Sequence, residues 1–191
     1  MSSVQDRADV LTPEEFYRLY ADDPYRRELV DGMVVTMSPP GPHHGRIDSR
    51  VGVPLAAFVR SHSLGDVVSN SGFVLRRDLV RAPDQAFVSN ERIEAAEGAE
   101  KGYWEVAPDL AVEVVSPDDR RSELDRKIRD YLECGVRMVW IIDPPTRTVT
   151  AYRPEREPRV LSGDDSLDGE DVVPGFRLPL AELWPPRARK K

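Results

Sequence analysis

Glu113 is the residue whose type and setting point most directly to chemistry. It stands alone in the aliphatic run Leu-Ala-Val-Glu-Val-Val of residues 110–115, and such a run predicts a buried strand whose side chains alternate between two faces. A carboxylate is costly to bury unless a positive charge or a metal ion compensates it. The run leaves two interpretations for Glu113: a structural ion pair with an arginine, or a metal ligand.

A second carboxylate, Asp84, follows Pro83 at the start of another predicted strand, residues 84–88. By itself Asp84 fits a simple turn. Paired with Glu113 on a neighbouring strand, it would form an oxygen-rich site of the kind that Mg²⁺ or Mn²⁺ prefers. The two carboxylates together therefore predict a divalent-metal site.

Lys127 adds a basic group on the helix predicted for residues 118–134. Side chains four residues apart share a helix face, which groups Lys127 with Glu123 and Tyr131. From this face a lysine can reach back over the sheet toward Glu113, where it would orient or deprotonate a water and stabilise charge that develops at phosphorus. The alternative is a solvated lysine paired with Glu123.

These residues fall on alternating strands and helices. The strand 110–115, the helix 118–134 and a buried strand 136–142 form a strand–helix–strand unit with a right-handed crossover by default. The pattern predicts an α/β (α+β) fold with a mixed central sheet flanked by helices. The other expected elements are a helix beginning after Thr12, a hairpin around Asp31-Gly32, a helix over 43–59 kinked or started late by Pro54, a strand over 67–75, a short helix and exposed loop in 90–102, an antiparallel edge strand over 149–152, β segments at 159–161 and 171–173, and a turn or helix near Leu180.

Length and composition predict one soluble domain over residues 1–191, with a core of about 12–183 and a basic tail at 184–191. No apolar run is long enough to span a bilayer, and the first residues lack the features of a secretory signal. Cys134 is the single cysteine, so no intrachain disulfide can form. The expected location is the cytoplasm, without membrane association.

The net charge of −7 argues against strong general binding to nucleic acid. The basic residues are nevertheless clustered, so weak binding of a polyanion is compatible with the sequence, as are ordinary solvated faces. The clusters are Arg76, Arg77 and Arg81; Arg120, Arg121, Arg126, Lys127 and Arg129; and Arg187, Arg189, Lys190 and Lys191.

Several motifs occur in a fixed order along the chain. They are Tyr25 with Glu28-Leu-Val-Asp-Gly, Met37-Ser-Pro-Pro with His43-His44, Ala-Pro-Asp-Gln-Ala-Phe-Val ending at Val88, Pro-Asp-Leu-Ala-Val-Glu-Val-Val-Ser-Pro ending at Pro117, Lys127, Tyr131, Gly135-Val136, and Val-Trp-Ile-Ile-Asp-Pro ending at Pro144. Together they resemble the Uma-two family of restriction-endonuclease-like proteins, over about residues 12–183.

The resemblance implies a PD-(D/E)XK nuclease fold with Asp84, Glu113 and Lys127 as catalytic residues. Asp84 and Glu113 would hold Mg²⁺ or Mn²⁺, with Glu28 as an accessory ligand. The usual nuclease pattern has a lysine two residues after the acid, where this chain has Val115. The resemblance implies that Lys127 replaces that lysine in space. One departure from the family is Glu123, which stands in place of an expected aspartate. His43 and His44 follow a proline-rich turn, and from this position we expect them to lie in a loop or at the mouth of the site.

The sequence therefore predicts a metal-dependent endonuclease that hydrolyses nucleic-acid phosphodiester bonds, with DNA as the expected substrate. The alternatives are a catalytically inactive nucleic-acid-binding or regulatory module with the same fold, and a dimeric scaffold. In the scaffold the edge strand near Tyr152 would form a homodimer interface.

Overall fold

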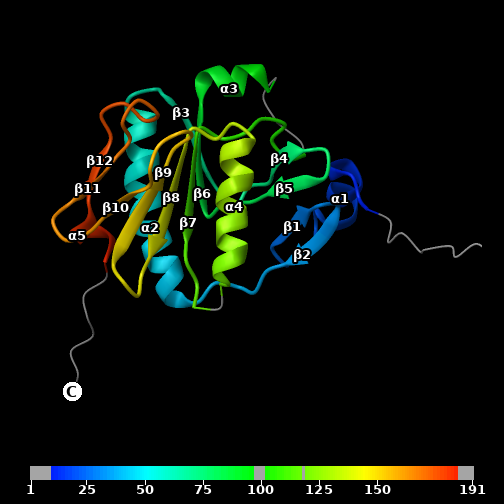
Figure 1. Cartoon of the computed structure of the whole chain (residues 1–191). Coiled ribbons are helices and arrows are strands. Elements are labelled where there is room, and N and C mark those ends of the chain that lie inside the picture. Colours follow the sequence, from blue (N-terminus) through cyan, green and yellow to red (C-terminus); the bar gives the residue numbers. More distant parts are fainter. Residues whose placement is uncertain (1–9, 97–101, 118, 185–191) are drawn as a thin grey trace, which may run out of the picture.

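Helix α4 (Arg121–Glu133) lies between a six-stranded and a four-stranded β-sheet (Figure 1). The computed structural model describes residues 10–96, 102–117 and 119–184. The six-stranded sheet has the order β10 (Arg159–Leu161), β9 (Thr148–Tyr152), β8 (Met138–Asp143), β7 (Leu110–Val114), β6 (Gln85–Ser89) and β3 (Gly65–Ser69). The four-stranded sheet has the order β2 (Met33–Thr36), β1 (Arg27–Val30), β5 (Leu79–Arg81) and β4 (Phe73–Arg76). The remaining elements are the ribbon of β11 (Ser166–Asp168) and β12 (Arg177–Pro179), and the helices α1 (Pro13–Tyr20), α2 (Pro42–Ser61), α3 (Asn90–Ala95), α4 (Arg121–Glu133) and α5 (Leu180–Leu183).

The six-stranded sheet is mixed, as the sequence predicted. β7 and β8 run parallel and are joined through α4, whereas the other strand pairs of this sheet are antiparallel. Helix α4 lies on one face of the sheet and α2 on the other (Figure 1). Along β7, Val112 belongs to the core cluster that includes α2, and Ala111 to the cluster that includes α4. This alternation directs Glu113 to the α4 face.

The β1–β2 hairpin closes through the predicted Asp31-Gly32 turn. Both turn residues have positive φ, 52° at Asp31 and 73° at Gly32, as the tight hairpin turn of this type requires. The register pairs Val30 with Met33 across the turn. The hairpin places β1, and with it Glu28, beside α4.

The predicted helix start after Thr12 is also confirmed. The Thr12 hydroxyl accepts a hydrogen bond from the Glu15 amide, and the Glu15 side chain accepts one from the Thr12 amide. This reciprocal pair satisfies two amides that the first turn would otherwise leave unpaired. Helix α1 therefore begins at Pro13.

Several element predictions were wrong. Residues 67–75 form two strands, β3 and β4, which lie in different sheets. Residues 171–173 form a turn. Of the two effects predicted for Pro54, a kink or a late start, the late start is absent, because α2 already begins at Pro42. Strand β9 is not an edge strand, because β10 pairs with its outer side. The open β9 edge assumed for the predicted dimer interface is thus covered by β10 at residues 149–151.

No helix in residues 10–96, 102–117 and 119–184 combines the length and apolar character needed to cross a bilayer.

We predict that Leu55→Ala destabilises the protein by about 2–5 kcal/mol, because Leu55 is fully buried between α2 and the sheet. Urea denaturation followed by circular dichroism measures the loss. Val53→Ala is the matched control on the same helix. Val53 is 68% exposed, so this change should stay within about 0.5 kcal/mol. Equal losses in the two variants would contradict this packing of α2.

Candidate active site

Lys127 and Glu113 meet between α4 and the sheet. The Lys127 Nζ atom lies 2.8 Å from Oε1 of Glu113. The same carboxylate oxygen accepts a 2.7 Å hydrogen bond from the hydroxyl of Tyr131, one helical turn after Lys127. All three side chains are buried, so the ammonium group is fixed in position without solvent between it and Glu113.

Glu28 holds Lys127 from the opposite side. Its Oε1 atom lies 3.1 Å from Nζ of Lys127 and accepts a hydrogen bond from the Ala82 amide. Its Oε2 atom accepts a 2.7 Å hydrogen bond from Arg81. Arg81 also binds Asp130 on α4 through Nε and Nη2. The strand β1, the end of β5 and helix α4 are thus tied together by buried charges.

Asp84 is anchored beside Glu113 by the backbone. The Val114 amide donates a 2.8 Å hydrogen bond to Oδ2 of Asp84, and His44 Nε2 lies 3.2 Å from the same oxygen. Arg26 donates from Nη1 to Oδ1 at 2.7 Å, and from Nη2 to the Ala82 carbonyl. Both oxygens of Asp84 therefore already have protein partners.

The structure brings Asp84, Glu113, Lys127 and Glu28 into one buried ionic cluster. Lys127 is 8% exposed and pairs with Glu28 and Glu113, which rules out the solvated pair with Glu123. The partner of Glu113 is likewise a lysine rather than an arginine. The cluster has four further members that the sequence did not predict as site residues: Arg26, Arg81, Asp130 and the hydroxyl of Tyr131.

Weak signals for two of these residues were present in the sequence. Asp130 and Tyr131 follow Lys127 by three and four residues, so all three lie on one helix face. Arg81 had been grouped with Arg76 and Arg77 as a basic surface patch, yet its side chain is buried. Arg26 carries no such local signal, because its contact with Asp84 spans 58 residues.

The pKa values of the two candidate metal ligands, Asp84 and Glu113, are shifted in opposite directions. Burial alone would raise the pKa of Asp84, but the His44 hydrogen bond and the Arg26 charge outweigh it and hold that pKa well below its usual range. Burial raises the pKa of Glu113, and the opposing charge of Lys127 does not fully offset it. Burial would lower the pKa of Lys127, yet the charges of Glu113 and Glu28 raise it above the ordinary value. Lys127 is therefore an ammonium ion at neutral pH.

Asp84 and Glu113 fit a divalent cation by donor type. Oε1 of Glu113 binds Lys127 and Tyr131, whereas Oε2 makes no hydrogen bond within the described part of the chain. The raised pKa of Glu113 marks a carboxylate that further positive charge would stabilise. The described residues contain no group of three or more His, Cys, Asp or Glu side chains arranged to hold a metal. Two carboxylates suffice for Mg²⁺, which usually keeps several of its waters.

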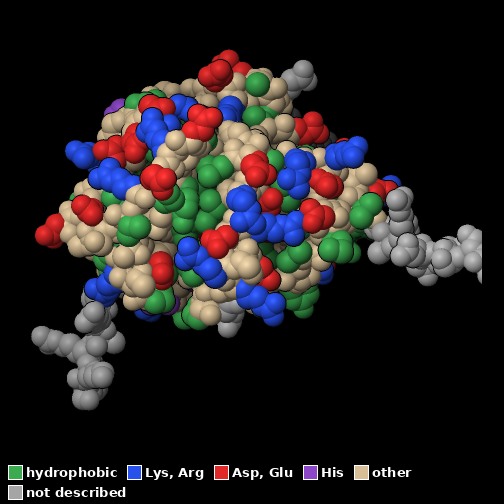
Figure 2. All heavy atoms as spheres, in the orientation of Figure 1, with side chains coloured by type: hydrophobic (Ala, Val, Ile, Leu, Met, Phe, Trp, Pro, Cys, Tyr) green, Lys and Arg blue, Asp and Glu red, His purple; other side chains and the backbone are tan. Residues whose placement is uncertain are grey.

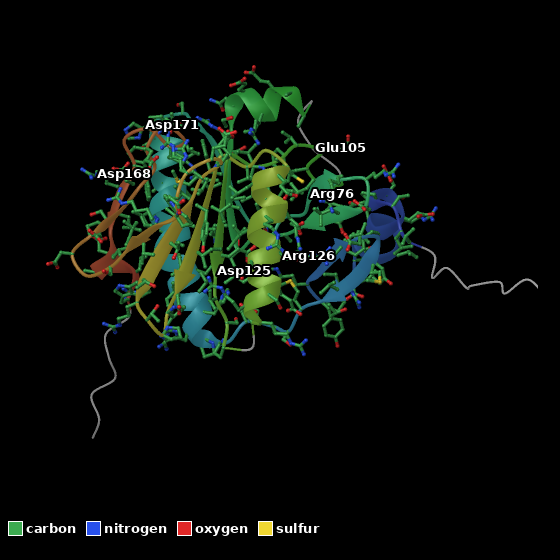
Figure 3. All side chains as sticks on the ribbon, viewed as in Figure 1. Arg76, Glu105, Asp125, Arg126, Asp168 and Asp171 are labelled. Atoms are coloured by element: carbon green, nitrogen blue, oxygen red, sulfur yellow. The ribbon has the colours of Figure 1, made fainter. Side chains whose placement is uncertain are left out.

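Surface charge around α4 is mixed rather than uniformly basic. Figure 2 shows acidic and basic side chains interspersed on this face. Arg126 of α4 and Arg76 of β4 (Figure 3) both pair with Asp31. Part of the predicted basic clusters is thus neutralised by acids, and residues 187–191 lie outside the described part of the chain.

Comparison with known proteins agrees with this architecture. The model of the Uma2 family, described as "putative restriction endonuclease", matches residues 13–181. The fold is similar to that of a putative nuclease belonging to DUF820 from Anabaena variabilis ATCC 29413, with a TM-score of 0.77 and 24% sequence identity over 91% of this chain and 97% of that chain. The predicted restriction-endonuclease-like fold is therefore confirmed. The search of curated proteins found no match.

We predict that Arg81→Met costs about 3–5 kcal/mol of stability, because it leaves two buried carboxylates, Glu28 and Asp130, without their shared counter-ion. Chemical denaturation measures the change. Arg77→Met, at an exposed position on the same segment, should remain within about 0.5 kcal/mol. A stable Arg81→Met protein would show that the cluster does not tie β5 to α4.

We predict that Glu113→Gln stabilises the metal-free protein at neutral pH, because it removes a buried charge that its surroundings undercompensate, while Lys127 keeps Glu28 as its counter-ion. Thermal unfolding in EDTA measures the gain. Since burial raises the pKa of Glu113, the gain should be full above that pKa and shrink as pH falls through it, where the wild-type carboxyl becomes neutral too. Glu123→Gln, at an exposed position on α4, is the control. Destabilisation by Glu113→Gln at neutral pH would refute this assignment.

Proposed function

The chain belongs to the Uma2 family, and from that premise we propose that it is a metal-dependent endonuclease that hydrolyses phosphodiester bonds of DNA. Family membership supports a nuclease, and with it a nucleic-acid substrate. The observation that carries the catalytic proposal is the buried Lys127 ammonium group, held 2.8 Å from Glu113 and 3.1 Å from Glu28. A charged amine fixed beside two acids is suited to stabilise the negative charge of a phosphodiester under attack.

Lys127 acts in this proposal as a cation rather than as a base. The charges of Glu113 and Glu28 outweigh burial and raise the pKa of Lys127, which keeps the amine protonated at neutral pH. Its role is to orient the attacking water and to stabilise the charge on the phosphate oxygens. Tyr131 supports this role by fixing the Glu113 oxygen that Lys127 binds.

Asp84 and Glu113 would hold the metal ion. When bound, Mg²⁺ or Mn²⁺ supplies Lewis-acid polarisation of the phosphate and activation of the attacking water. The Val114 amide sets the position of Asp84 beside Glu113 before any ligand arrives. This pre-organisation reduces the reorganisation needed during the reaction.

Glu28 fits a positioning role better than the predicted role of an accessory metal ligand. Both of its oxygens are bound by protein groups, Oε1 by Lys127 and the Ala82 amide and Oε2 by Arg81. A ligand role would require breaking at least one of these buried contacts. We propose that Glu28 holds Lys127 in place.

One observation favours the non-catalytic alternative. Both oxygens of Asp84 are bound by protein groups, from Arg26, His44 and Val114. A protein that binds nucleic acid without cleaving it has no need of a free Asp84 oxygen for a metal ion. The cleavage assay below distinguishes the two functions.

We predict that the purified protein cleaves DNA in Mg²⁺ or Mn²⁺ but not in EDTA, and that Asp84→Asn and Lys127→Met each lower the rate by about 100-fold or more. Supercoiled plasmid, single-stranded DNA and an RNA of matched sequence are the substrates. Arg129→Met, at an exposed position on the same helix as Lys127, is the control and should retain full activity.

Two results would contradict the proposal. Cleavage that persists in EDTA or in both variants would come from another site or from a contaminant. Binding of DNA without cleavage in either metal would favour the non-catalytic module. Faster cleavage of RNA than of DNA would correct the substrate and leave the site intact.

A further inference from the structure

Arg26 occupies an unusual position for a structural arginine. Its guanidinium lies on Asp84, the predicted metal ligand, with Nη1 2.7 Å from Oδ1. The side chain is only 18% exposed, and Nη2 donates to the Ala82 carbonyl. A positive charge thus already stands where a divalent cation would approach Asp84.

The arginine also faces the other carboxylates of the cluster. Burial alone would lower the pKa of Arg26, but the charges of Glu113, Asp84 and Glu28 outweigh it and raise the pKa. The guanidinium therefore compensates both predicted metal ligands, Asp84 through a direct hydrogen bond and Glu113 through space.

Asp84 does not need Arg26 to remain anchored. Its other oxygen, Oδ2, is held by the Val114 amide at 2.8 Å and by His44 Nε2 at 3.2 Å. If the guanidinium moved away, Asp84 would keep its place against β7 and expose Oδ1. The contact of Arg26 with Asp84 can thus be exchanged without dismantling the site.

One donor of Arg26 is unused. Its Nε atom is buried and has no hydrogen-bond partner within the described residues, as is also true of Arg27 Nε and His44 Nδ1, but of the two arginines only Arg26 contacts Asp84. A buried N–H without a partner is costly, and native proteins retain such a group rarely and usually for a reason. Arginine presents its N–H groups in a planar fork that matches the oxygens of a phosphate.

We propose that Arg26 is a phosphate-binding residue of this site, held on Asp84 in the free protein and transferred to a phosphate oxygen of the bound strand. A divalent cation and Arg26 then compete for Oδ1 of Asp84, and the free Nε donor is used when the strand binds. The inference rests on the proposed function, since it needs Asp84 as a cation ligand and a phosphodiester as substrate.

The first test measures Mn²⁺ affinity without nucleic acid, by isothermal titration calorimetry. Arg26→Gln should bind Mn²⁺ several-fold more tightly than the wild-type protein, because the competing cation is gone. Arg27→Gln is the matched control, since Arg27 pairs with Asp23 and Thr36 instead, and its affinity should be unchanged. Equal or weaker Mn²⁺ binding by Arg26→Gln would overturn the proposal. This comparison tests whether Arg26 competes for Asp84, and the phosphate contact is tested separately.

The second test measures the phosphate contact. Arg26→Gln should lower kcat/KM for DNA cleavage by about 100-fold, and Arg26→Lys should recover part of the loss. Unchanged kcat/KM in Arg26→Gln would overturn the phosphate role. Thermal unfolding checks that each variant is folded, and Arg26→Lys keeps the positive charge if Arg26→Gln is unstable.

The two proposals fail in different ways. A wild-type protein that does not cleave DNA refutes the proposed function, while the Mn²⁺ comparison still decides whether Arg26 competes for Asp84. In that case fluorescence anisotropy with a short DNA duplex decides the phosphate role. Arg26→Gln must then weaken DNA binding in Mn²⁺, and unchanged binding overturns the role.

Discussion

The cost of burying charge governs the arrangement of this protein. Four carboxylates and three permanent cations share a space closed by α4, the large sheet and the small sheet, and each carboxylate stays buried because a cation or an amide lies within hydrogen-bond distance. The members are Glu28, Asp84, Glu113 and Asp130, with Arg26, Arg81 and Lys127. Removing one partner of such a pair leaves an uncompensated charge, which typically costs several kcal/mol. The cluster therefore fixes the two sheets and α4 relative to one another.

Compensation within the cluster is uneven, and this unevenness is what suits it to chemistry. Asp84 is compensated on both oxygens, whereas Glu113 keeps a raised pKa despite its contact with Lys127. A cluster built only for stability would distribute its counter-charges more evenly, or would be replaced by apolar residues at little cost. Residues whose pKa is displaced by burial and specific partners are typical of functional sites. The raised pKa of Glu113 indicates that its buried charge is incompletely compensated.

Much of this arrangement follows from local sequence rules. Strand alternation separates Glu113 from Val112 and Val114, and helical spacing groups Lys127 with Glu123 and Tyr131. The packing of α4 on β7 then decides that Lys127 meets Glu113. The Asp31-Gly32 turn and the capping box at Thr12 are equally local, and both are present. The partners of each charge are not local. Arg26 contacts Asp84, which lies 58 residues later in the chain. The pairing of β10 with β9 likewise cannot be predicted from the hydrophobic pattern of either strand. Periodicity identifies the face of a side chain, while its partner depends on how distant segments pack.

The central claim is that Asp84 and Glu113 hold a divalent cation beside Lys127. Crystals soaked in Mn²⁺, with diffraction recorded at a wavelength where manganese scatters anomalously, test it most directly. The account predicts one strong anomalous peak at ligand distance from oxygens of both Asp84 and Glu113, absent from crystals of Asp84→Asn. A peak elsewhere, or none at saturating Mn²⁺, would contradict the assignment of this cluster as the metal site.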